Sequence, residues 1–123
     1  MTAGDHYKYI DPAYINEMAD GEDEFIVQVL DIYLSSMPAH IARLAEVAQG
    51  TDYAEIIFGT HKLRSSLNFI GGQQMISVLD KIDVLCTAQT DLPTIRELVK
   101  AVAGMAGEIN AELGYLLKQV KNQ

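Results

Sequence analysis

A histidine in the middle of the chain is flanked by residues that could support nucleophilic chemistry. His61 lies in the run THKLRSS, residues 60–66. On a helix, residues three and four positions further on lie on the same face, so Arg64 and Ser65 are neighbours of His61. An imidazole with an ordinary pKa of about 6.5 is largely neutral at neutral pH and can attack through one ring nitrogen. The pattern therefore gives a nucleophile a cation within reach and a small side chain that leaves space above the ring.

The helix that carries His61 is expected to turn its ring away from the core. At about 100° per residue, His61 lies about 120–140° from the centre of the apolar stripe on this helix. The stripe comprises Tyr53, Ile56, Thr60, Leu63, Leu67 and Ile70. Gly71 and Gly72 are expected to end the helix. The histidine should thus face solvent or a partner.

These residues resemble the phosphoacceptor motif of histidine phosphotransfer (HPt) domains in two-component phosphorelays. That motif reads His, any residue, Leu, Lys, Gly, Ser, Ser, and then a small pair a few residues on. The direct matches are His61, Leu63, Ser66 and Gly71. Arg64 stands where Lys is usual and Ser65 where Gly is usual, so charge and small size are kept, although Arg has a larger, planar fork. Ile10-Asp11, the Asp-Glu-Phe run at 23–25 and a proline within the long helix extend the resemblance.

The resemblance implies a phosphocarrier, not an enzyme. His61 would accept a phosphoryl group from a receiver-domain aspartate and pass it to another receiver, with Arg64 stabilising the phosphate. The implied partners are receiver domains of response regulators and of a hybrid sensor kinase. No cofactor is expected on this chain, and Mg²⁺ is expected on the partner receiver domain.

An acceptor that holds the imidazole is also implied. In the family, a Gln or Glu 22 residues after the histidine commonly fills this role, and here that position is Asp83. Asp83 is the candidate for orienting the imidazole. The alternative is a solvated acid at the edge of an apolar stripe, and both interpretations stay open at this point.

Apolar residues on the His61 side of the helix predict a docking patch for a partner. They are Ile57, Phe58 and Phe69. On the preceding long helix, Phe25, Val29 and Ile32 also flank the apolar stripe, and there a wide apolar sector facing the core is the favoured explanation.

The remaining pattern predicts an all-α protein: an antiparallel four-helix bundle with a short extra N-terminal helix. Residues 1–10 are expected to form a flexible N-terminal arm and residues 11–123 the bundle. The expected helices are a short one opened by Asp11, one over about 22–49 kinked at Pro38, the His61 helix capped by Thr51 or Asp52, and two later ones. The last is capped by Asp91 and contains three glycines, which indicate either close helix approach or fraying. They are Gly104, Gly107 and Gly114.

Composition excludes several function classes. The chain has 123 residues, 49% of them hydrophobic, and a formal net charge of −8, which argues against nucleic-acid binding. No signal peptide or membrane span is expected, and a single cysteine favours the cytoplasm. His6 and His40 have no neighbours at metal-ligand spacing, so no metal site is expected. The stripes close on one another, which favours a monomer.

Two rival interpretations of the function accompany the phosphocarrier. The first is a non-phosphorylated helical adaptor that docks receiver or kinase domains. The second is an HPt domain excised from a larger hybrid kinase, against which the starting Met1 and the N-terminal arm favour a free-standing chain.

Overall fold

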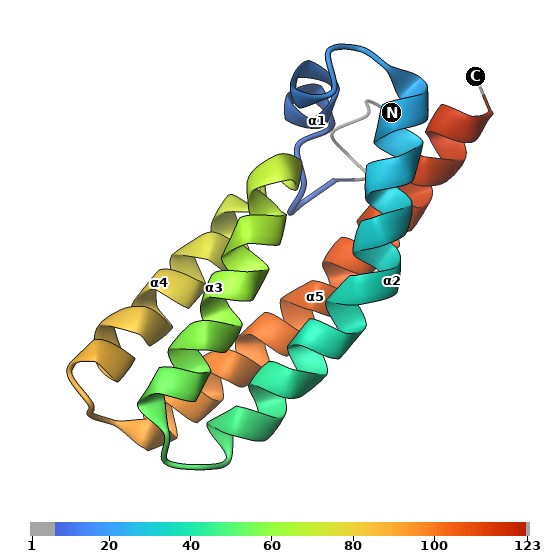
Figure 1. Cartoon of the computed structure of the whole chain (residues 1–123). Helices are drawn as coiled ribbons and strands as arrows, with labels where there is room; N and C mark the ends of the chain where they lie inside the picture. Colours follow the sequence, from blue (N-terminus) through green and yellow to red (C-terminus); the bar gives the residue numbers. More distant parts are fainter. Residues whose placement is uncertain (1–6, 123) are drawn as a thin grey trace.

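Four long helices form an antiparallel bundle, and a short helix lies across one end (Figure 1). The computed structural model describes residues 7–122, and no strand occurs in that range. The helices are α1 (Pro12–Met18), α2 (Asp23–Ala48), α3 (Tyr53–Ile70), α4 (Gln73–Thr87) and α5 (Leu92–Lys121). The contacts α2–α3, α3–α4, α4–α5 and α5–α2 close a ring, while α1 packs on α3 and α2. The predicted all-α fold is confirmed.

Aspartate side chains begin three of the helices, as the sequence predicts. Asp11 accepts a hydrogen bond from the backbone N–H of Tyr14, and Asp91 from that of Thr94. Asp52, rather than Thr51, caps α3. Gly71 then ends α3 in the left-handed conformation with φ 71°, and α4 begins two residues later. This tight connection fixes the register of α4 against α3.

The core is built from the apolar stripes. On α3, the predicted positions from Ile56 to Ile70 are fully buried, and Tyr53 is half-buried. On α4, the buried residues are Met75, Leu79, Ile82 and Cys86. Helix α2 runs without interruption through Pro38, and Ile41 of its stripe is half-buried. By length and composition alone α2 could cross a membrane, but here its stripe packs against α3 and α5.

The segment before α1 is tied to the far end of the chain. The backbone N–H groups of Tyr9 and Ile10 donate to the carboxylate of Glu112 on α5, at 2.9 and 3.1 Å. Tyr9, Ile10 and Glu112 are all buried. Residues 1–6 of the predicted flexible arm lie outside the described residues. Residues 9 and 10 belong to the packed interior, and the prediction of a loose arm is wrong for them.

The glycines of α5 do not serve close helix packing. A Cβ atom built at Gly104, Gly107 or Gly114 would meet nothing within 4 Å, so that interpretation is wrong. The close approach occurs at Gly59 of α3, where a Cβ would lie 3.1 Å from Cδ1 of Leu44 on α2. A glycine here therefore lets α2 and α3 lie close together.

Candidate functional site

The ring of His61 projects outward from α3, as the helix periodicity predicts. Its side chain is 61% exposed, while the flanking Thr60 and Leu63 are fully buried and fix the orientation of this turn. Nε2 of His61 lies 3.6 Å from Oδ2 of Asp83 on α4. That separation is too long for a hydrogen bond. The ring therefore stands beside the carboxylate without being held by it.

Asp83 is anchored on two sides. Its Oδ1 accepts a hydrogen bond from the Thr60 hydroxyl at 2.5 Å, and its Oδ2 accepts one from Nη2 of Arg64 at 2.7 Å. Its side chain is only 20% exposed. The interpretation of Asp83 as a merely solvated acid is therefore wrong. Its role in orienting the imidazole stays a prediction.

Arg64 lies across the seam between α3 and α4. Its Nη2 contacts Oδ1 of Asp80 at 2.6 Å as well as Oδ2 of Asp83 at 2.7 Å. Hydrogen bonding to Asp83, followed by the attraction of both carboxylates, raises the pKa of the Arg64 guanidinium despite the opposing effect of burial. Oδ2 of Asp83 is thus bound by the guanidinium and lies 3.6 Å from Nε2 of the imidazole, so the cation lies near His61. Ser65 is exposed on the same face.

The three predicted docking residues have different surroundings. Phe58 is 64% exposed, with Nζ of Lys62 4.8 Å from its ring centroid. Ile57 is half-buried against the core. Phe69 is also half-buried and forms a T-shaped contact with Phe25 on α2, with ring centroids 5.9 Å apart. Phe58 is therefore the member of the predicted patch that is most available to a partner.

Three apolar residues that flank the stripe of α2 differ in their exposure. A wide apolar sector facing the core was expected to account for Phe25, Val29 and Ile32. Val29 does pack against the core. Ile32 is 64% exposed and Phe25 43% exposed, so the explanation is wrong for Ile32 and incomplete for Phe25. Apolar side chains of α2 are thus presented to solvent.

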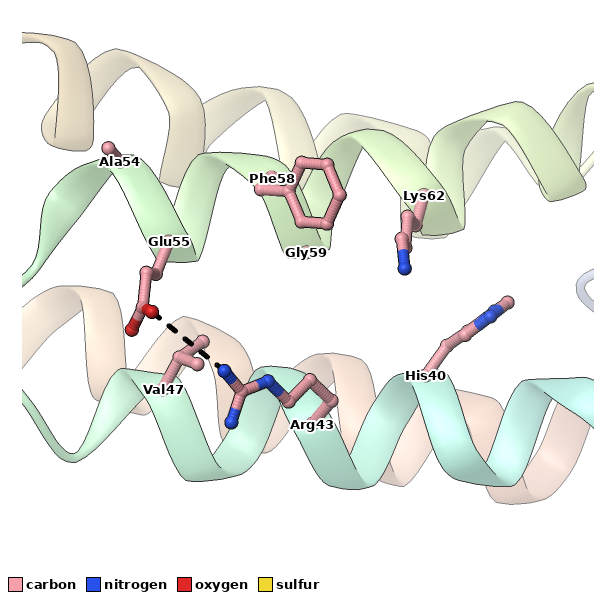
Figure 2. Close-up of a pocket in the computed structure, with 8 residues that line it drawn as sticks. All are labelled: His40, Arg43, Val47, Ala54, Glu55, Phe58, Gly59 and Lys62. Carbon is pink, nitrogen blue, oxygen red and sulfur yellow. Dashed lines mark ion pairs between the residues drawn. The ribbon is translucent and has the colours of Figure 1, made fainter.

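A groove between α2 and α3 lies beside Phe58 (Figure 2). It holds about 420 Å³. Its lining residues are His40, Arg43, Val47, Ala54, Glu55, Phe58, Gly59 and Lys62. An ion pair of 3.8 Å between Arg43 and Glu55 spans it. The groove was not predicted from the sequence. The available signal was the missing side chain at Gly59, inside a run of larger residues.

Metal ligands do not gather in the part of the chain that the structure describes. Across residues 7–122, no three His, Cys, Asp or Glu side chains lie close enough together to hold a metal ion. Cys86 lies buried on α4, one turn after Asp83. Burial, and secondarily the charge of Asp83, raises the pKa of its thiol to about 11.

An antiparallel helical bundle that displays a histidine beside a cation and a carboxylate is similar to HPt proteins, and one relative supports this likeness. Over 101 residues, 77% of this chain, the sequence is 26% identical to the "Phosphorelay intermediate protein rdeA" of Dictyostelium discoideum. The aligned region spans 40% of that relative. No family model and no solved structure matches the chain.

Proposed function

We propose that the chain is a phosphorelay phosphocarrier. His61 accepts a phosphoryl group from an aspartate of one receiver domain and passes it to another. The observation that carries this proposal is the exposed imidazole, with Arg64 and Asp83 placed beside it. The similarity to a phosphorelay intermediate protein supports it.

The transfer is a displacement at phosphorus. One neutral ring nitrogen of His61 attacks the aspartyl phosphate, so that an N–P bond forms while the P–O bond to the receiver's carboxylate breaks. The carboxylate leaves with the electron pair. The second ring nitrogen keeps its proton and needs an acceptor. Asp83, whose Oδ2 lies 3.6 Å from Nε2, is the candidate for this role once the two side chains move closer. Passing the group onward is the same step in reverse.

Phosphoryl transfer depends mainly on positioning and charge neutralisation. On this chain, Arg64 supplies positive charge beside the ring, and the small Ser65 leaves room for the incoming group. The receiver domain supplies Mg²⁺ and its own acidic pocket. The chain thus acts as an acceptor and donor of the phosphoryl group, and its exposed Phe58 lies where a receiver approaching His61 would make contact.

The test is phosphoryl capture from a phosphorylated receiver domain. The wild-type chain should take label that survives base and is lost in acid, as a phosphoramidate is. His61→Gln should abolish capture without changing the helical circular dichroism signal, because the ring nitrogen is the nucleophile. His6→Gln should leave capture intact.

Label retained by His61→Gln would contradict the assignment. A wild-type chain that binds the receiver but takes no label would instead support the alternative, a non-phosphorylated adaptor.

A further inference from the structure

We infer that Asp80 is a positioning residue that holds Arg64 in a resting clasp and thereby weakens retention of the phosphoryl group on His61. The clasp consists of Arg64, Asp80 and Asp83. The inference rests on the proposed function and adds a residue that sets the balance between capture and release.

Both carboxylate contacts of Arg64 fall on one guanidinium nitrogen, Nη2. Nη2 of a guanidinium carries two N–H groups, and here two carboxylate oxygens accept from it, one of Asp80 and one of Asp83. The Asp83 oxygen is also the one that lies 3.6 Å from the imidazole. Nε and Nη1 carry the other three N–H groups of the guanidinium. A phosphoryl group on His61 that binds Nη2 must therefore displace a carboxylate, and one that binds Nε or Nη1 shares the positive charge with both carboxylates.

Asp80 can release Arg64 more readily than Asp83 can. Asp83 is 20% exposed and is also bound by the Thr60 hydroxyl. That hydroxyl has one proton, and the ionised carboxylate, at 2.5 Å, is a stronger acceptor than the Ile57 carbonyl at 2.8 Å. Asp80 is 62% exposed and reaches Arg64 through one oxygen. Water can replace that contact readily, so Asp80 is the partner that Arg64 exchanges.

The net charge around His61 also disfavours its phosphorylated state. The clasp holds two carboxylates and one guanidinium, and a phosphoryl group adds a charge of about −1.5 to −2. Neutralising Asp80 removes both a competitor for Arg64 and a nearby negative charge. Asp80 therefore keeps the phosphorylated state less stable than it would otherwise be, which favours release to the next receiver.

The experiment compares the wild-type chain with Asp80→Asn in equilibrium with a phosphorylated receiver domain. Asp80→Asn should shift the equilibrium toward phosphorylated His61 by about two- to fivefold, which lies in the upper part of the range measured for exposed ion pairs. The half-life of the isolated phosphohistidine should lengthen in parallel. Asp31→Asn removes the same charge from an exposed position on α2 and should leave both quantities unchanged.

A double-mutant cycle tests whether the effect of Asp80→Asn on the equilibrium depends on the Arg64 guanidinium. In an Arg64→Ala background, Asp80→Asn should have less than half of its effect, because there is no cation to release. An undiminished effect would assign it to direct repulsion and overturn the inference.

Other outcomes separate this inference from the proposed function. Equal equilibria for wild type and Asp80→Asn, with His61 labelled in both, would overturn the inference alone, as would an equal shift in Asp31→Asn. A wild-type chain that takes no label would overturn the proposed function and the inference with it.

Discussion

At the scale of single residues, Arg64 has the most informative surroundings. One of its nitrogens contacts carboxylates on two successive turns of α4, so the side chain joins α3 to α4 as well as facing His61. A lysine ammonium could carry the charge but not the planar fork. The arginine at this position therefore combines a contact between helices with a cation near the ring of His61.

Replacing Arg64 should affect transfer more than folding. Arg64→Ala should slow phosphoryl capture and shorten the phosphohistidine half-life by about tenfold or more, since about tenfold is the lower limit for losing a hydrogen bond to a charged group. The free energy of unfolding should fall by about 1 kcal/mol or less, because such ion pairs near the surface contribute little. Rapid-quench kinetics and chemical denaturation measure the two effects.

Arg64→Lys is the matched control for this prediction, since it keeps the charge and should recover part of the rate. Transfer and phosphohistidine lifetime that are both unchanged in Arg64→Ala would reduce Arg64 to a structural ion pair.

Sequence reasoning placed His61 correctly because the angle of a residue on a helix follows from its position relative to the apolar stripe. The partners of Arg64 could not be predicted in this way. Which turn of α4 faces Arg64 depends on the Gly71–Gly72 connection and on the packing of two helices. Asp83 was found by the spacing typical of the family, whereas Asp80 and the hydroxyl of Thr60 were not assigned any contact.

At the scale of the elements, helical periodicity predicted most of the buried positions. It did not predict the burial of one charged residue, Glu112. Glu112 lies at the edge of the α5 stripe, next to the buried Leu113. Helical periodicity alone treats such a position as solvent-facing. Its burial depends on Tyr9 and Ile10, more than 100 residues earlier in the chain. A contact of this range has no local signal in the sequence.

The open space around Gly104 predicts a stabilising substitution. Gly104→Ala should raise the free energy of unfolding by about 0.8–1 kcal/mol, because alanine favours the helix and its Cβ would meet nothing within 4 Å. Urea denaturation at constant m-value measures the gain.

Gly71→Ala is the contrasting variant. Its φ of 71° and the 3.2 Å separation of the added Cβ from Cβ of Asp11 should make it destabilising by about 1–2 kcal/mol. A loss of stability in Gly104→Ala would mean that α5 does not stay helical through this position.

At the scale of the whole molecule, one face combines several features that suit a partner. The groove between α2 and α3 places Phe58 beside two cations, Arg43 and Lys62, on a chain whose net charge is −8. Apolar area supplies affinity, while local charge steers the encounter. A carrier must also leave one partner for the next, so we expect this contact to be small and short-lived.

Phe58→Asp should weaken receiver binding by about 1 kcal/mol or more, since a large exposed aromatic beside the reactive ring is removed. The melting temperature should change little because Phe58 is 64% exposed. Isothermal titration with a receiver domain and a thermal melt measure the two quantities.

Met18→Asp is the control for Phe58→Asp: Met18 is 50% exposed on α1, at the end of the bundle, and its substitution should leave binding intact. Unfolding of Phe58→Asp, or equal losses of binding in both variants, would show that the docking face is misplaced.

The link between Glu112 and the segment before α1 has a consequence for the order of folding. Most contacts in an antiparallel helical bundle join neighbours in the sequence and form quickly. The hydrogen bond from Tyr9 to Glu112 closes a loop of 103 residues, and its entropic cost is repaid only once α5 is in place. We therefore expect α2 to α5 to assemble first and this link to close afterwards. The link would then lower the rate of unfolding and have little effect on the rate of folding.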